Sequence, residues 1–352
     1  MRKAVILNLL CVVFIAGISL AAEENKGRWT KKINMVIPRG LHAAAVVNGK
    51  IYVIGGHDVG VNPTSVVEEY DPATDSWKKK ANMPTARREL SASVVNGKIY
   101  VIGGSAGGWK FGDAVEEYDP VTDKWRKKVN MPTRRKGLST SAVNGKIYAI
   151  GGGWAGANKL PTLEEYDPVA DKWERKADMP TARCALSTCV VNGKIYAIGG
   201  KPLIAFGQGP PLPTVEEYDP ATNRWTKKAD MPTPRWGLAV VALNGKIYAI
   251  GGCFDENRPY STVEIYDPAT DTWTKGPDMP TARWYLSASV VDGKIYAIGG
   301  MVAPWVLTPV VEEYNPSPVG REIQAEGKLA ICWGQIKAEA GVQRNDLRHE
   351  DE

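Results

Sequence analysis

The chain has 352 residues, of which 43% are apolar and 24% charged, and its formal net charge at pH 7 is +5. An apolar share of this size with a modest charge balance indicates a soluble globular protein. The net charge is small for a nucleic-acid-binding protein, so we expect no nucleic-acid partner.

Residues 1–22 have the pattern of a secretory signal peptide. Arg2 and Lys3 form a basic start, Ala4 to Ile18 is apolar apart from one Asn, and small residues follow. This apolar stretch is too short for a comfortable membrane span, and no later stretch is long and apolar enough. We therefore expect cleavage of residues 1–22, a secreted or periplasmic location, and no membrane span.

Between residues 23 and 316 one unit recurs six times, and its clearest copy runs from Asn96 to Trp125 as NGKIYVIGG, a variable loop, and VEEYDPVTDKW. The second glycine of each pair falls at Gly56, Gly104, Gly152, Gly200, Gly252 and Gly300, in steps of 48, 48, 48, 52 and 48 residues. A period near fifty with a Gly pair, a Tyr and a Trp resembles the kelch repeat, which builds a β-propeller. The resemblance implies an all-β, six-bladed kelch-type propeller.

A short segment at Trp29 precedes the first full unit and matches the segment at Trp77 that ends that unit. The last unit has Tyr314 but no Trp seven residues later. The two halves complement each other. We infer that an N-terminal outer strand completes the sixth blade and closes the ring, as is common in propellers of this family.

Each unit predicts four antiparallel strands, A to D. In the second unit strand A covers Ser91 to Val95, and the Asn96-Gly97 pair then forms a two-residue hairpin turn, which needs positive φ at both positions. Strand B is KIYVIGG, strand C is VEEYDP, and a turn with Pro at its second position leads to strand D at Lys124. The Tyr of strand C and the Trp of strand D are expected to pack blade against blade.

Strand D is the outermost strand and carries runs of lysine at 78–80, 127–128 and 227–228. Lysine on an edge strand guards against pairing with another chain, and we favour that interpretation. Binding of an anionic polymer is the alternative.

Because each strand of a unit runs antiparallel to the one before it, all six B–C loops and all six D–A junctions lie on the same face of the propeller. The units differ from one another there, and variable loops carry function on scaffolds of this kind. The loops contribute aromatic side chains that suit sugar faces or apolar peptide side chains, and the candidates for ligand contact are Trp109, Trp154, Phe254 and Trp305.

The D–A junctions carry one arginine in every unit and strand C carries one glutamate in every unit. We predict six structural Arg–Glu pairs, formed between Arg39, Arg87, Arg135, Arg183, Arg235 and Arg283 and, in the same order, Glu68, Glu116, Glu164, Glu216, Glu264 and Glu312.

The two residues after each arginine begin strand A and therefore surround the mouth of the central channel. In kelch propellers that bind peptides, contacts often come from this neighbourhood, and the resemblance implies the same here. The candidates are Arg88, Glu89, Lys136, Trp236, Trp284 and Tyr285.

Four cysteines remain after residue 22: Cys184, Cys189, Cys253 and Cys332. We favour small buried thiols, with a Cys184–Cys253 bridge as the alternative. The sequence has three histidines and no assembled ligand set, so we expect no metal and no cofactor. Residues 317–352 form a charged tail without repeats, to which no role is assigned.

The leading hypothesis is an exported binding module that holds a protein segment or a carbohydrate over the channel mouth. The alternative is a carbohydrate-active enzyme of the sialic acid mutarotase (N-acetylneuraminate epimerase) type, a class found among exported bacterial kelch propellers. In that case Glu89 would act as general acid/base, with Arg88 and Lys136 as cations for the substrate carboxylate. A structural or adhesive surface protein is a third hypothesis.

Overall fold

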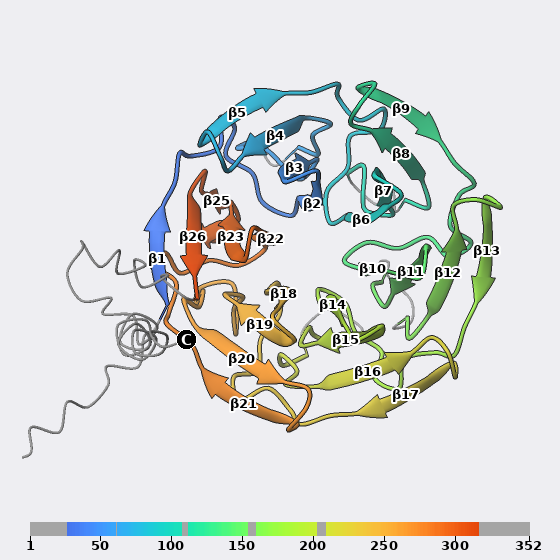
Figure 1. Ribbon diagram of the computed structural model, residues 1–352, viewed down its shortest axis with the longest axis vertical. Coiled ribbons are helices and arrows are strands. Elements are labelled where there is room, and N and C mark those ends of the chain that lie inside the picture. The colour runs from blue at the N-terminus through green and yellow to red at the C-terminus, as the bar shows by residue number, and fades with distance from the viewer. Residues whose placement is uncertain (1–26, 61, 108–111, 154–159, 203–208, 317–352) are drawn as a thin grey trace, which may run out of the picture. The chain divides into compact units, whose positions relative to one another are not determined.

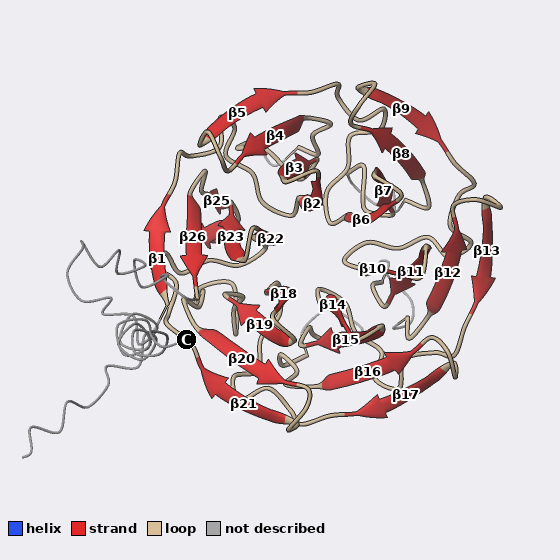
Figure 2. Ribbon diagram, viewed as in Figure 1, coloured by secondary structure: helices blue, strands red, loops and turns tan. Residues whose placement is uncertain are grey.

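The computed structural model describes residues 27–60, 62–107, 112–153, 160–202 and 209–316. These residues form six four-stranded antiparallel sheets arranged as blades around a central axis (Figure 1), which confirms the predicted β-propeller. Every regular element in this part of the chain is a strand (Figure 2), and none of it forms a helix that could cross a membrane. The predicted signal peptide and C-terminal tail, with Cys332, lie outside the described residues.

Four strand positions repeat from the axis outward. The innermost strands, A, are β2 (Ala43–Val47), β6 (Ser91–Val95), β10 (Ser139–Val143), β14 (Ser187–Val191), β18 (Ala239–Leu243) and β22 (Ser287–Val291). The B strands are β3 (Lys50–Ile54), β7 (Lys98–Ile102), β11 (Lys146–Ile150), β15 (Lys194–Ile198), β19 (Lys246–Ile250) and β23 (Lys294–Ile298). The C strands are β4 (Val67–Asp71), β8 (Val115–Asp119), β12 (Leu163–Asp167), β16 (Val215–Asp219), β20 (Val263–Asp267) and β26 (Val311–Asn315).

The outermost strands, D, are β5 (Ser76–Lys79), β9 (Lys124–Lys127), β13 (Lys172–Arg175), β17 (Arg224–Lys227), β21 (Thr272–Lys275) and β1 (Arg28–Lys31). A further short hairpin, formed by β24 (Met301–Ala303) and β25 (Val306–Leu307), lies in the sixth B–C loop.

The ring is closed by the N-terminal strand, as predicted. Strand β1 pairs antiparallel with β26 and brings Trp29 opposite Tyr314, the same register that joins Trp77 to Tyr70 within the first blade. The sixth blade is therefore built from both ends of the propeller segment.

The A–B hairpin turns follow directly from the sequence. Asn96 and Gly97 have φ values of 50° and 72°, and Asp292 and Gly293, which replace the pair in the sixth blade, have 48° and 72°. Both positions need the left-handed region, which Asn, Asp and Gly adopt at low cost.

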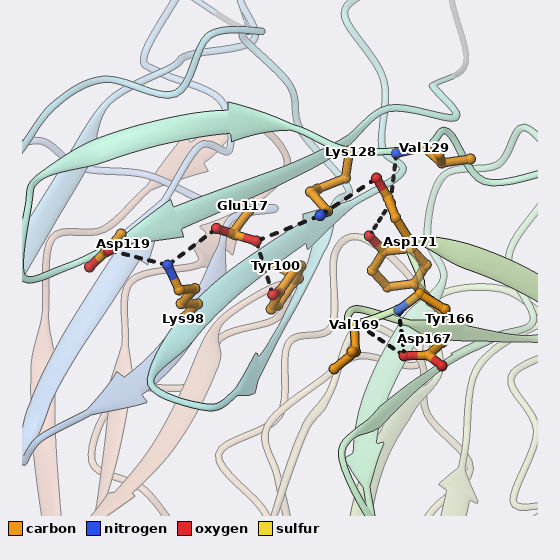
Figure 3. A network of polar contacts seen from close by, with 11 residues as sticks. Lys98, Tyr100, Glu117, Asp119, Lys128, Val129, Tyr166, Asp167, Val169 and Asp171 are labelled. Carbon is orange, nitrogen blue, oxygen red and sulfur yellow. Dashed lines mark hydrogen bonds and ion pairs between the residues drawn. The ribbon is translucent and has the colours of Figure 1, made fainter.

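Neighbouring blades are joined by a repeated polar clamp at the C–D turn. In the third blade the Asp171 carboxylate accepts hydrogen bonds from the Tyr166 hydroxyl and from the backbone N–H of Val129 in the second blade (Figure 3). Lys128 lies 3.5 Å from the same carboxylate, and Trp173 Nε1 donates to the Val129 carbonyl at 3.1 Å. The Tyr and Trp of each unit thus contribute directed hydrogen bonds as well as apolar area.

The glycine pair at the end of strand B allows the next blade to approach. A Cβ on Gly55 would lie 2.7 Å from the carbonyl oxygen of Arg87, and one on Gly56 would lie 2.6 Å from that of Gly40. The Gly56 N–H donates to the Arg87 carbonyl at 2.9 Å. A side chain at Gly55 would therefore push the second blade away, and one at Gly56 would push the start of the innermost strand away from strand B within the first blade.

Candidate functional site

The B–C loops and D–A junctions meet on one face. In every blade the first junction residue after the arginine forms a β-bridge with the first loop residue, as Arg88 does with Ser105 and Trp236 does with Cys253. The variable loops are therefore attached directly to the rim of the channel.

Inside this rim lies a closed ring of six residues, one from each blade, which we call the inner ring: Leu41, Glu89, Gly137, Ala185, Gly237 and Tyr285. Each N–H donates to the carbonyl of the ring residue in the preceding blade, at 2.7–3.2 Å, and the Leu41 N–H closes the circle on Tyr285. All six have φ between 50° and 62°. Four are not glycine, so the backbone is held in a left-handed conformation at some cost.

The channel below the inner ring forms a cavity of about 190 Å³, lined by the starts of the six innermost strands. One part of its wall carries hydroxyl groups that bond from blade to blade. Thr140 Oγ1 lies 2.9 Å from Ser91 Oγ and 2.8 Å from Ser93 Oγ, and Thr188 repeats this arrangement with Ser139 and Ser141. The first and fifth blades contribute alanine and valine instead.

Glu89 is the only charged side chain of the inner ring. Its Oε1 accepts a hydrogen bond from Lys136 Nζ at 2.8 Å, and the exposed fractions of the two side chains are 12% and 33%. Arg88 is half-buried beside it. The sequence-predicted charged candidates of the second and third blades therefore lie together at the mouth.

The aromatic candidates at the mouth pack against one another. The rings of Trp236 and Trp284 meet edge-on with centroids 4.8 Å apart, and Tyr285 lies 4.7 Å from Trp284. Trp236 and Trp284 are only 5% and 4% exposed, in a cluster with Cys253 and Met301. They support the rim and offer little surface to a ligand, whereas Tyr285 is half-buried and lines the cavity.

Lys201 is a mouth residue that sequence reasoning missed. Its ammonium lies 3.4 Å from the centroid of the Trp236 ring, a cation–π contact. It is the first residue of the fourth B–C loop and pairs with Cys184 through the backbone. Its position directly after a Gly pair was the available signal.

The outer rim presents exposed apolar side chains from the fifth, sixth and first loops. Trp305 is 54% exposed at the turn of the β24–β25 hairpin, with its ring edge-on to His57, and Val306, Phe254 and Val59 are also exposed. Trp109 and Trp154 lie outside the described residues.

The structure contains an Arg–Glu ion pair in each of the six blades. The Nη2–Oε2 distances run from 2.5 to 3.0 Å, and all twelve side chains are buried. Burial lowers the pKa of Arg135 to about 10, against the opposing effect of the Glu164 charge. Thr133 donates to the other oxygen of Glu164, and four further blades repeat this contact. The pairs hold the D–A junctions to the C strands.

Two buried histidines distinguish the first blade. His42 stands where the other five blades have leucine, and its Nε2 lies 2.9 Å from Ser287 Oγ of the sixth blade. Burial, together with the charges of Arg39 and Arg283, lowers the pKa of His42 to about 3. Burial also lowers the pKa of His57, with a contribution from Arg88. Among the described residues no group of His, Cys, Asp and Glu side chains could hold a metal ion.

Cys184, Cys189 and Cys253 are free and buried. Burial raises the pKa of the Cys184 thiol to about 11 and raises that of the other two as well. The favoured interpretation of these three cysteines agrees with the structure, which contains no Cys184–Cys253 bridge.

Six four-stranded blades around a central channel define a β-propeller built from sequence repeats. A family model described as the KLHDC2/KLHL20/DRC7 Kelch-repeats domain matches residues 21–200, and the Kelch motif matches residues 182–232, 234–280 and 283–317. The chain belongs to the kelch-repeat family.

Short stretches also match curated proteins. The chain is 49% identical to alpha-scruin of Limulus polyphemus over 39 residues, 46% to Kelch-like protein 40 of Xenopus tropicalis over 39, and 46% to an F-box/kelch-repeat protein of Arabidopsis thaliana over 44. These stretches cover 11–12% of this chain and only 4%, 6% and 12% of the relatives' own lengths.

Among solved structures, the one titled "Structure of YjhT" superposes with a TM-score of 0.68 at 19% identity. It covers 78% of this chain and 94% of that chain. At this identity the likeness concerns the fold.

Proposed function

We propose that this protein is an exported binding module that holds a segment of another protein over the channel mouth. The proposal rests on the distribution of side chains over the loop-bearing face, where apolar and charged side chains occupy different blades. Exposed Trp305, Val306 and Phe254 lie on the rim of the fifth and sixth blades, while Glu89, Lys136 and Lys201 occupy the second to fourth. An extended segment with apolar and acidic side chains matches both halves.

A carbohydrate is the less favoured ligand because the two tryptophans nearest the channel, Trp236 and Trp284, are buried. Trp236 packs against Trp284 and carries Lys201 over its ring, so neither tryptophan offers a free face for a sugar to stack on. Export remains part of the proposal on the strength of the N-terminal sequence pattern.

The test is selection of a displayed peptide library on the mature protein, followed by affinity measurements with the selected peptides. We expect a double variant with Trp305→Ser and Lys201→Gln to weaken binding at least tenfold. The matched control, Lys227→Gln on the outer wall, should leave affinity unchanged. Peptides that bind both variants like the wild type would overturn the proposed site.

The sialic acid mutarotase hypothesis remains the second candidate because one observation favours it. Glu89 is a half-buried carboxylate that lines the cavity and accepts a hydrogen bond from Lys136, and Arg88 precedes it in the sequence. Nuclear magnetic resonance of sialic acid anomers measures the reaction directly. Catalysed anomer exchange that disappears in Glu89→Gln would establish it, and unchanged exchange rates at high protein concentration would exclude it.

A further inference from the structure

Each outer strand ends in a basic residue, and the residue three positions later is an aspartate in three blades and an asparagine in the other three. After β13, β17 and β21 this residue is an aspartate that pairs with the cation: Arg175 with Asp178 at 2.8 Å, Lys227 with Asp230 at 3.2 Å, and Lys275 with Asp278 at 3.3 Å. After β1, β5 and β9 the same position is an exposed asparagine, at Asn34, Asn82 and Asn130.

This exchange divides the outer wall by charge. Residues 28–34, 76–82 and 124–130 include ten basic and no acidic residues, whereas 172–178, 224–230 and 272–278 include seven basic and four acidic residues. In the first group one lysine of each segment is directed inward, as Lys128 is toward Asp171 (Figure 3). The other cations are exposed and form no ion pair among the described residues: Arg28, Lys31, Lys78, Lys79, Lys124, Arg126 and Lys127.

The three basic segments are neighbours. Strands β1, β5 and β9 belong to the sixth, first and second blades, which follow one another around the ring. Figure 1 shows that these outer strands run along the circumference, one after another. The seven exposed cations lie on three consecutive outer strands and make up a positively charged surface, the basic arc, over half of the outer wall.

Protection of edge strands accounts for lysine on the outer wall but not for its asymmetry. All six outer strands have the same length and the same pattern of exposure, yet only three carry the neutralising aspartate. Like charges held close together destabilise a fold slightly. Their concentration on adjacent blades therefore favours the interpretation that this surface binds a ligand of opposite charge.

We propose that the basic arc binds a linear anionic polysaccharide that follows the circumference of the propeller. The arc turns through three consecutive sides of the ring, so a flat anionic membrane would contact only part of it, whereas a flexible chain can follow all of it. An acidic polypeptide would gain little from strand pairing, because each outer strand has only four residues. Carboxylate or sulfate groups spaced along a sugar chain can be bound by electrostatic attraction alone, and the exposed cations of the arc supply the charges for it.

The test uses heparin and polygalacturonate as probes, with full-length protein and charge variants that restore the missing aspartates. We expect the triple variant Asn34→Asp, Asn82→Asp, Asn130→Asp to weaken binding about tenfold, because each new carboxylate competes for one cation. The reverse triple variant, Asp178→Asn, Asp230→Asn, Asp278→Asn, lies outside the basic arc and should leave the affinity unchanged. All six positions are exposed, and the Asn130 Nδ2 donates a hydrogen bond to Asp113 at 3.3 Å, so circular dichroism checks that each variant folds.

A matched control separates position from net charge. The variant Lys172→Gln, Arg224→Gln, Lys227→Gln removes three charges from the opposite half and should bind both probes like the wild type. Equal weakening in this control would overturn the proposal, as would absence of binding at physiological salt. Tighter binding to poly-glutamate or to phosphatidylserine vesicles than to either polysaccharide would also overturn it. The mouth is untouched in every variant, so failure here leaves the peptide site unaffected.

Discussion

The indole Nε1 of Trp29 donates a hydrogen bond to the carbonyl oxygen of Pro277 at 3.0 Å, across 248 residues of sequence. The same bond joins the other five blades to their predecessors, as from Trp125 to Ala81 at 2.9 Å. At those five joints the N–H of the accepting residue also donates to a turn side chain, such as Asp123. Pro277 has no N–H, and Gly27 stands where the other blades have the turn Asp or Asn, so the closing joint has neither the donor nor the acceptor of that bond.

Because the closing joint has fewer bonds, Trp29→Ala should release β1 from β26. We expect a loss of about 2 kcal/mol in the free energy of unfolding, since the half-buried ring loses packing and one hydrogen bond. Hydrogen exchange of the β26 amides measures the release. Trp125→Ala is the matched control: it should destabilise to a similar degree while β26 amides stay slow. Equal protection of β26 in both variants would contradict the prediction.

His42→Leu should remove a pH dependence from stability. The pKa of His42 is about 3 in the folded protein, against about 6.5 when unfolded. Between these values the unfolded chain binds a proton that the folded protein does not. Above about pH 6.5 the protonation of His42 therefore does not lower the free energy of unfolding. Below that pH the free energy of unfolding falls by about 1.4 kcal/mol per pH unit as the pH drops toward 3.

Leucine is the residue of the other five blades at that position, so the variant should fold normally. Urea unfolding of both proteins between pH 4 and 8 gives the difference in free energy at each pH. A constant difference across this range would show that His42 is not the group responsible.

Glu164→Gln should cost about 3 kcal/mol of stability, because it leaves the buried Arg135 charge without its partner. Replacing both residues together, with Arg135→Met and Glu164→Leu, should recover part of that loss. Denaturant unfolding measures each variant. If the double replacement is no more stable than the single one, the arginine contributes chiefly through its bonds to the Gly151 and Thr162 carbonyls.

The thiols of Cys184, Cys189 and Cys253 should react slowly with iodoacetamide at pH 8 in the native protein. Burial blocks access and raises the pKa of each, so little thiolate is present. Peptide mapping by mass spectrometry gives the rate for each cysteine, and unfolding in urea should raise each rate at least a hundredfold. Rapid native labelling of Cys184 would indicate that the mouth opens.

The blade architecture could be predicted because its signals are local and repeated. The Asn-Gly turns need positive φ, the Gly pairs need close backbone approach, and Trp29 and Tyr314 are complementary halves of one unit. The turns and the Gly pairs recur in all six blades, so a single misjudged copy would not have changed the result.

The mouth was harder to predict because it depends on contacts between blades. The hydrogen-bonded inner ring has no residue signature, since Leu41, Glu89, Ala185 and Tyr285 share only their φ. Trp236 and Trp284 follow the arginine like Lys136, yet they turn against each other and become buried. The orientation of each tryptophan side chain depends on the size of the side chains in neighbouring blades. The sequence of a single unit does not contain that information.

The inner ring also has an electrostatic consequence. Its six hydrogen bonds all run in the same sense around the axis, so the peptide dipoles they align lie head to tail in a circle. Dipoles arranged in this way cancel as vectors and project no field along the axis, in contrast to the end of a helix, where they add. The potential that a ligand meets above the opening is therefore determined by individual side chains. A charge-changing substitution at Glu89 or Lys136 would therefore alter the local potential while the backbone hydrogen bonds of the ring stay in place.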